Sequence, residues 1–299
     1  MFLIIAAGIL VRRCGWISSA TAKEANSLCF KLFVSTLLFH NIYTADLRTI
    51  FDPFLMALCL GGIVVEWLIG MALIPRIESA NPRRGVMIQS FFRTNTVLMG
   101  IPLATALYGD GNIGPVAVVC PFATLLFNML GVITLETFRG EKPTPVHLLK
   151  GIATNPLICA ALLGTAMSLL QLRLPTVIET SVGNIAKAAT PMSLVLMGAS
   201  LDFRRLKSSL RNLALCTVVR LVIAPTVFVS SALALGFRGV ALCTVLMVFS
   251  TPIAVNSYTM ALQMDGDADL AGGLVLTTTA VSCVTLFLWI WLLKSFGLL

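Results

Sequence analysis

Charged residues are scarce in this sequence. Asp, Glu, Lys and Arg together make up 11% of its 299 residues, whereas apolar residues make up 58%. A soluble domain carries roughly 25% charged residues, and a soluble fold of this length could not bury so much apolar surface. The scarcity of charge therefore predicts a protein that is embedded in a lipid bilayer.

Motifs of common enzyme, metal and nucleic-acid sites are also missing. There is no HExxH, Walker A or GxSxG motif, and none of the eight cysteines forms a CxxC pair. No basic stretch precedes the first apolar run, so no signal peptide is expected. The net charge of +8 comes from basic residues spread over short loops, not from a patch that would neutralise phosphates. We therefore expect no enzyme activity, cofactor, metal or nucleic-acid partner.

Long apolar runs dominate what is present. Because the hydrocarbon core is about 30 Å thick, a spanning helix needs roughly 20 apolar residues, and continuous runs favour helices over strands. The sequence predicts an all-α membrane protein with ten transmembrane helices. They cover residues 1–11, 26–45, 53–75, 86–108, 113–138, 156–171, 182–201, 212–235, 239–262 and 270–293.

The first of these runs is too short to span. Residues 1–11 would rise only about 16 Å as a helix. Either the true start lies upstream, which we prefer, or the helix is short and buried against others.

Basic residues in the loops predict the orientation, because short loops rich in Lys and Arg stay in the cytoplasm. The odd-numbered loops hold 13 of them and the other side holds five. The first set is Arg12, Arg13, Lys23, Arg76, Arg83, Arg84, Arg139, Lys142, Lys150, Arg204, Arg205, Lys207 and Arg211. The second set is Arg48, Arg173, Lys187, Arg238 and Lys294. The ninth loop has Asp265, Asp267 and Asp269 but no base, and acidic residues contribute little. We expect a multi-pass protein of the cell inner (plasma) membrane with both termini outside.

The chain also divides into two similar halves. A first five-helix repeat covers residues 1–138, a cytoplasmic connecting loop covers 139–155, and a second five-helix repeat covers 156–299. An odd number of helices per half inverts the second half in the membrane. Two weak similarities agree with this: residues 45–48 (Ala, Asp, Leu, Arg) resemble residues 201–204 (Leu, Asp, Phe, Arg), and Pro102 and Pro252 lie half a chain apart.

Inverted repeats place their substrate near the midplane, between interrupted helices. Helices four and nine each carry a proline with hydroxyl and amide residues nearby. We expect helix four to break at Gly100–Pro102, so that a half-helix starting at Gly100 directs its positive dipole end toward an anion. The predicted substrate-binding residues are Asn95, Thr96, Gly100, Pro102, Thr251, Pro252 and Asn256.

Charged residues inside spans are candidates for function. Glu66 in helix three could couple transport to protons, pair with a base or face a polar crevice. Arg93 could attract anions or simply mark the membrane interface, and Arg220 could extend to the interface along its stem. Asn128, one helix away, is expected to lie outside the site.

Helix four also carries a recognisable motif. Residues 95–102 (NTVLMGIP), followed by Leu107, Tyr108 and Gly109, resemble the fourth-helix signature of the auxin efflux carrier family of permeases. Arg12-Arg13 with Gly15, residues 191–201 and residues 251–269 resemble other parts of that family. The resemblance covers essentially the whole chain.

That resemblance implies a fold and a function. It implies ten helices in two inverted repeats, a scaffold of helices one, two, six and seven, and broken helices four and nine that cross at their prolines beside a carboxylate site. Plant carriers have a proline before the motif Asn where this chain has Thr94, which argues against the plant hormone as substrate. Bacterial-type members are associated with malate and malonate, so we expect a permease for small organic anions. The protein could also form a homodimer.

Two alternatives differ in mechanism or class. One is a proton- or sodium-coupled symporter or antiporter of the wider crossed-helix superfamily. Such antiporters keep paired acidic residues beside the crossing, and none lies in residues 93–108 or 249–264. The other is a membrane receptor, which would usually carry an additional cytoplasmic domain.

Overall fold

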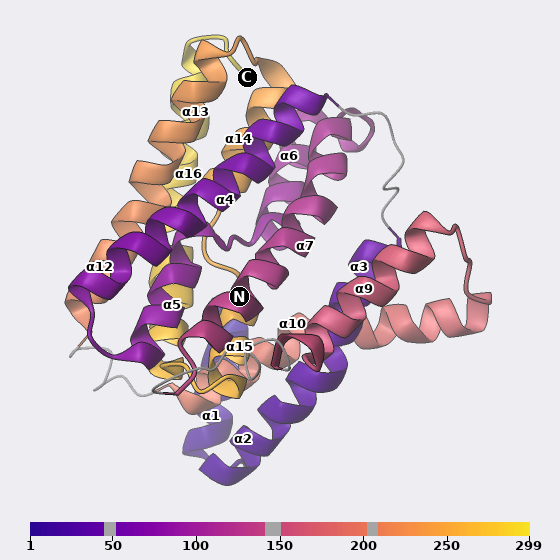
Figure 1. The fold of residues 1–299 in the computed structure, drawn as a ribbon, viewed down its shortest axis with the longest axis vertical. Coiled ribbons are helices and arrows are strands. Elements are labelled where there is room, and N and C mark those ends of the chain that lie inside the picture. The colour runs from indigo at the N-terminus through magenta and orange to yellow at the C-terminus, as the bar shows by residue number, and fades with distance from the viewer. Residues whose placement is uncertain (45–51, 141–150, 202–208) are drawn as a thin grey trace.

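The computed structural model describes residues 1–44, 52–140, 151–201 and 209–299, and these form helices joined by short connections (Figure 1). Within those ranges there is no strand, only one isolated β-bridge between Thr94 and Ile253. The predicted all-α class is therefore confirmed for the described residues.

The first half of the chain forms helices close to the predicted runs. Three of its segments are short and irregular: η1 and η2 are π-helical, and η3 is a single 3₁₀ turn. In order, the elements are α1 (Phe2–Arg13), α2 (Ser19–Leu28), η1 (Cys29–Val34), α3 (Ser35–Tyr43), α4 (Pro53–Ile77), α5 (Asn81–Phe92), η2 (Thr96–Gly100), α6 (Ile101–Tyr108), η3 (Asp110–Asn112) and α7 (Gly114–Thr137).

The second half repeats this alternation of long and interrupted helices. Its one irregular segment, η4, is a π-helical turn inside a longer helix. The elements are α9 (Pro156–Leu169), α10 (Thr176–Ser200), α12 (Leu210–Val218), η4 (Val219–Ile223), α13 (Ala224–Ala234), α14 (Gly239–Ser250), α15 (Asn256–Gln263) and α16 (Ala268–Ser295).

Four helices in the described part are long and apolar enough to cross a membrane. They are Pro53–Ile77, Gly114–Thr137, Leu210–Ala234 and Ala268–Ser295. Each has between 24 and 28 residues, and about 20 are sufficient at 1.5 Å per residue. Many of their large apolar side chains remain exposed, among them Leu68, Val227 and Phe287, as expected for surfaces that face lipid.

The helices pack in two groups, which Figure 1 shows side by side. One group contains α1, the α2–α3 segment, α9 and α10, and the other contains the remaining helices. Within the first group, α1 and α10 lie close together because each has a glycine at the contact. A Cβ at Gly8 of α1 would clash with the carbonyl of Val195, and a Cβ at Gly198 of α10 would clash with the carbonyl of Ile5.

Polar contacts join residues at or near the ends of several helices. Arg83 pairs with Asp267 at 3.1 Å, and Arg139 pairs with Asp265 at 2.8 Å. Asn212 donates to Glu78 at 2.9 Å. The chain between α4 and α5, the residues that follow α7, the start of α12 and the chain before α16 therefore lie at the same end, where Arg83 and Arg139 balance the charges of Asp267 and Asp265.

Several sequence predictions concern residues outside the described ranges. They include the similarity between the two halves, which lies at residues 45–48 and 202–204, and most of the connecting loop 139–155. Among the counted bases, the following lie outside the described residues: Arg48, Lys142, Lys150, Arg204, Arg205 and Lys207.

Candidate functional site

Two interrupted helices of the second group meet at the points where they are interrupted. The helix is interrupted between α5 and η2, at residues 93–95, and again between α14 and α15, at residues 251–255. Thr94 and Ile253 form an antiparallel bridge, and the Asn95 N–H donates to the Pro252 carbonyl at 2.8 Å. Each break thus satisfies backbone groups of the other, which unwound chain inside a membrane requires.

The first break lies earlier than the sequence predicted. Helical structure resumes at Thr96, so the prediction that a half-helix starts at Gly100 is wrong. Gly100 and Pro102 lie inside the resumed helix, where the π-helical turn η2 passes into α6. The missing N–H of Pro102 is accommodated by this wider turn, in which the Ile101 N–H bonds to the Thr96 carbonyl. The second break does include Pro252, as predicted.

A cavity of about 90 Å³ lies beside the crossing. It is lined from both helix groups: α3 and α10 contribute from the first group, and α7 and the two breaks from the second. No Asp or Glu is among its lining residues, which are Leu37, Asn41, Arg93, Thr94, Asn95, Val97, Leu98, Thr124, Phe127, Asn128, Thr190, Ala254, Val255 and Asn256.

Arg93 is the one charged residue of that lining. Its side chain lies in the interior, with 2% of the residue exposed, so it does not mark the membrane interface. Nη2 donates to Oδ1 of Asn128 at 2.8 Å, and Nη1 contacts the sulfur of Met260. A Cβ at Gly131, one turn after Asn128 on α7, would lie 2.7 Å from Nη1. The glycine therefore leaves room for the guanidinium.

Hydrogen-bond donors at the cavity are left without partners. Within the described residues, neither Nε of Arg93 nor Nδ2 of Asn95 has an acceptor, and both atoms are buried. Buried polar groups are nearly always hydrogen-bonded in folded proteins. Together with a cation and no lining carboxylate, these free donors favour an anionic ligand that accepts hydrogen bonds.

The cavity includes two of the seven predicted binding residues, Asn95 and Asn256. The other five lie near it but do not line it. Gly100 allows close packing, since a Cβ there would lie 3.2 Å from Met247 of α14. The Thr251 hydroxyl bonds to the Met247 carbonyl. The remaining three, Thr96, Pro102 and Pro252, belong to the breaks and the helix that resumes after the first one.

Other lining residues were missed by the sequence reasoning. Asn41 on α3, Thr190 on α10, and Thr124 and Asn128 on α7 reach the cavity. The prediction that Asn128 lies outside the site is wrong. Polar residues inside apolar spans were the available signal, but which face of each span meets the cavity depends on packing.

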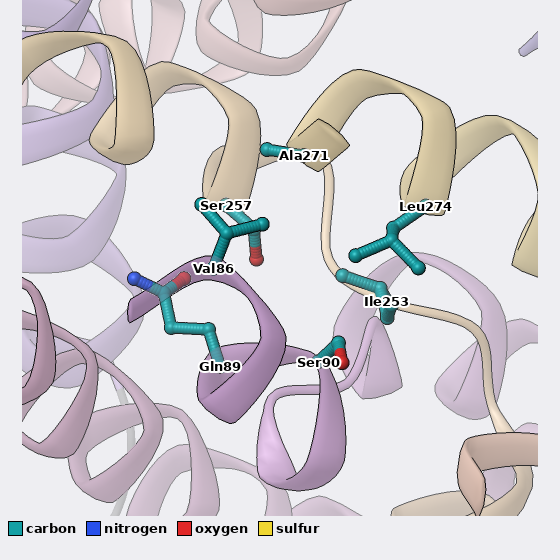
Figure 2. A pocket seen from close by; sticks show the side chains of 7 residues that line it. All are labelled: Val86, Gln89, Ser90, Ile253, Ser257, Ala271 and Leu274. Atoms are coloured by element: carbon teal, nitrogen blue, oxygen red, sulfur yellow. The ribbon is translucent and has the colours of Figure 1, made fainter. Parts of the chain in front are cut away.

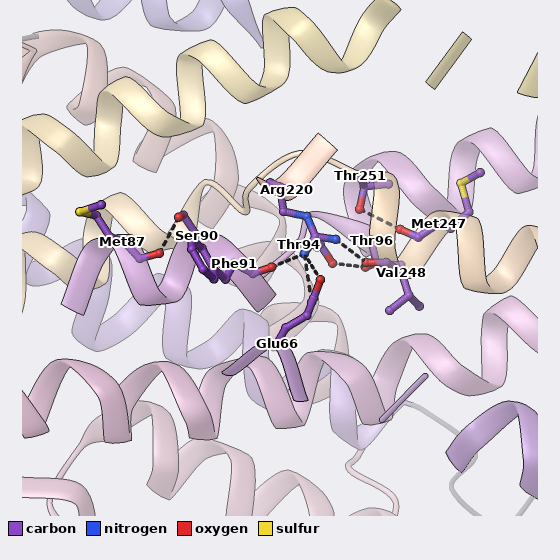
Figure 3. Close-up of polar contacts among 10 residues, drawn as sticks. All are labelled: Glu66, Met87, Ser90, Phe91, Thr94, Thr96, Arg220, Met247, Val248 and Thr251. Carbon is purple, nitrogen blue, oxygen red and sulfur yellow. Dashed lines mark hydrogen bonds and ion pairs between the residues drawn. The ribbon is translucent and has the colours of Figure 1, made fainter. Parts of the chain in front are cut away.

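Glu66 lies elsewhere, in a buried ion pair with Arg220 (Figure 3). Nη1 of Arg220 is 3.2 Å from Oε2 of Glu66 and also donates to the Phe91 carbonyl, while Nη2 donates to the Val248 carbonyl at 3.2 Å. Of the alternatives for Glu66, pairing with a base is the one observed. Arg220 is fully buried, so the expectation that it extends to the interface is wrong.

Arg220 therefore joins the ends of both interrupted helices. Phe91 lies in the last turn of α5 and Val248 in the last turn of α14. Carbonyls there lose their helical partners at a break, and the helix dipole makes these ends negative. One guanidinium compensates both ends, and Glu66 balances its charge.

A second, much smaller cavity lies between α5, α15 and α16 (Figure 2). Its volume is about 10 Å³, which is near the minimum for one water molecule. Gln89 and Ser257 line it, and the Gln89 Oε1 and the Ser257 Oγ have no partner among the described residues. Its size excludes an organic substrate.

Comparison with known proteins identifies the family. The family model described as "Membrane transport protein" matches residues 1–145 and 144–290, which together are nearly the whole chain. The chain belongs to this family. The resemblance of its helix-four motif to the auxin efflux carriers is thereby confirmed, and the protein is a multi-pass membrane transporter.

Two relatives agree with that assignment. This transporter is 25% identical to an "Uncharacterized transporter" of Methanothermobacter thermautotrophicus over 291 residues, covering 97% of this chain and 95% of the relative. It is 28% identical to a "Putative malonate transporter" of Rhizobium meliloti over 146 residues, covering 48% of this chain and 45% of that protein.

Proposed function

We propose that this transporter carries small organic anions, carboxylates such as malate or malonate, by alternating access around the crossing. The observation that supports this most is the cavity where the two breaks meet, with its free donors and without a carboxylate in its lining. The name of the Rhizobium relative points to the same class of substrate.

Within this proposal Asn95 and Asn256 contact the substrate. Their amides offer hydrogen-bond donors without the cost of burying further charges, so the anion can leave again. The other predicted residues, Thr96, Gly100, Pro102, Thr251 and Pro252, act by shaping the breaks and the helix that follows the first one.

The proposed architecture comprises ten spans in two inverted five-helix repeats, 1–138 and 156–299. The two interrupted segments support it, because each consists of a helix, an extended stretch beside an asparagine, and a second helix. The chain between α4 and α5, the residues that follow α7, the start of α12 and the chain before α16 meet at one end. We propose that this end is cytoplasmic and that both termini lie outside the inner membrane.

The alternative is coupling to a proton or a sodium ion. Glu66 remains the proposed proton-coupling residue, and its pairing with Arg220 at the ends of α5 and α14 connects it to both breaks. A protonation change there would alter the charge that compensates the two helix ends.

Transport by purified protein tests the proposal. Proteoliposomes would be given labelled malonate, malate, succinate and acetate, with empty liposomes as the control. We expect saturable movement of small carboxylates and mutual competition among them. Folded protein that moves none of these acids in either direction would exclude the proposed function.

A further inference from the structure

We propose that Arg93 binds one carboxylate of the substrate directly, that Asn128 positions its guanidinium, and that the preferred substrate is a short dicarboxylate. This inference rests on the proposed function and assigns the charged part of the same site.

The first argument is that Arg93 is buried without a counterion. No carboxylate within the described ranges lies within ion-pair distance of its guanidinium. Its contacts are an amide oxygen of Asn128 and the thioether of Met260, and a thioether is a weak acceptor. A buried charge is costly unless it is paired and hydrogen-bonded. A carboxylate in the cavity would supply both the charge and the acceptors.

The second argument is the contrast with Arg220, which is equally buried. Arg220 has a carboxylate, Glu66, and two backbone carbonyls as partners. Its charge is balanced within the chain, and it is not among the residues that line the cavity. Arg93 lines the cavity and has no carboxylate partner among the described residues, whereas the Nε of both arginines lacks an acceptor there. The two arginines therefore have different roles: Arg220 joins the helix ends, whereas Arg93 binds a ligand in the cavity.

The third argument concerns the charge that the site can balance. Besides Arg93, two helices begin at the cavity: Thr96–Tyr108, next to Asn95, and α15, whose first residue is Asn256. Each N-terminus is equivalent to roughly half a positive charge. With Arg93 this gives about two positive charges, the complement of a dianion. The unpaired Nδ2 of Asn95 offers a donor to the second carboxylate.

The size of the cavity agrees with a short molecule. The cavity of about 90 Å³ is several times the roughly 10–15 Å³ that a single water molecule needs. A small molecule of a few carbon atoms suits this space better than a large one. Malonate is therefore a suitable probe, and malonamide, in which neutral amides replace both carboxylates, tests the effect of charge at nearly constant shape.

Calorimetric titration of purified protein in detergent tests the inference. Wild-type protein should bind malonate more tightly than malonamide. Arg93→Gln should weaken malonate binding roughly 10- to 150-fold, the loss expected for a hydrogen bond to a charged group. It should also bring the malonate and malonamide affinities closer together, because malonamide has no carboxylate for Arg93 to bind. A purely structural role would weaken both ligands equally, so an unchanged ratio would overturn the proposal. Arg76→Gln, at an exposed arginine of α4, controls for net charge.

A second variant keeps the proposal testable if Arg93→Gln does not fold. Asn128→Asp would place a carboxylate beside the Arg93 guanidinium, where Asn128 Oδ1 now accepts at 2.8 Å. This built-in counterion should preserve folding and compete with the substrate, so malonate binding should fall at least tenfold. Asn112→Asp, in an exposed connection, is the matched control.

The outcomes separate this inference from the proposed function. If Arg93→Gln and Asn128→Asp bind malonate as wild type does, while Asn95→Ala binds it weakly, the role of Arg93 is excluded and the site at the crossing stands. If wild-type protein neither binds nor transports any carboxylate, the proposed function itself fails.

Discussion

The backbone N–H of Asn95 donates to the carbonyl oxygen of Pro252 at 2.8 Å. This bond joins residues from opposite halves of the chain at the points where their helices are interrupted. Proline has no N–H of its own to donate, but its carbonyl accepts here. The bond therefore satisfies one backbone N–H of the first interruption and one backbone carbonyl of the second. The two breaks are consequently held in register, and any movement of one is expected to carry the other along.

Gly131→Ala should displace the guanidinium of Arg93. The added Cβ would lie 2.7 Å from Nη1, so the arginine must shift away from Asn128. We expect malonate affinity to fall at least about tenfold, as for loss of a charge-assisted hydrogen bond. Gly61→Ala on α4, where a Cβ meets nothing within 4 Å, is the control. Equal affinities for the two variants would contradict the placement of Arg93 in the site.

Glu66→Gln should destabilise the protein. Removing one partner of a buried ion pair leaves an uncompensated charge and typically costs about 3–5 kcal/mol. Arg220 would keep its bonds to the Phe91 and Val248 carbonyls but lose its counterion. Thermal unfolding in detergent, compared with the exposed Glu24→Gln, measures the effect. Equal melting temperatures would show that the pair contributes little to stability.

The same variant tests proton coupling if it is incorporated into proteoliposomes. If Glu66 couples protons, Glu66→Gln should transport malonate at a rate independent of pH, while malonate binding persists. A variant that retains the pH dependence of wild type would leave Glu66 with a structural role alone.

The contacts of Glu78 should make the end of the helices where it lies less stable in acid. Burial by itself raises the pKa of this carboxyl, but hydrogen bonds from the Ala80 N–H and Asn212, together with the charge of Arg83, lower the pKa overall. Its contribution is therefore present above the ordinary pKa of a glutamate and is lost as the pH falls through the lowered value. Wild type should be more stable than Glu78→Gln at pH 7, and the difference should vanish in strong acid. A difference that grows toward low pH would contradict the sign of this shift.

The sequence predicted the long helices and the second interruption, because long apolar runs and polar residues inside them are local signals. The four clear spans match α4, α7, the α12–α13 segment and α16. The position of the first break was wrong, because its cause is not local. Pro102 led to the prediction of a break at Gly100. The chain instead unwinds where Thr94 pairs with Ile253, a contact that exists only in the folded chain.

The composition of the site was harder to predict than its location. Asn128 lies on α7, a helix that is apolar on all sides, so the sequence does not reveal which face is turned inward. Arg220 was misjudged for a related reason. Its partners include the backbone carbonyls of Phe91 and Val248, and no sequence pattern shows that these are free and close together.

Binding of malonate to Asn95→Ala tests the central claim most directly. Asn95 lines the cavity, and its Nδ2 has no partner within the described residues. Loss of one hydrogen bond to a charged ligand should cost about 1.5–3 kcal/mol, or roughly 10- to 150-fold in affinity. Asn95→Asp should bind more weakly still, because it adds a negative charge, and the exposed Asn112→Ala should bind normally. If folded Asn95→Ala and Asn95→Asp both bind malonate as tightly as wild type, the substrate site is not at this crossing.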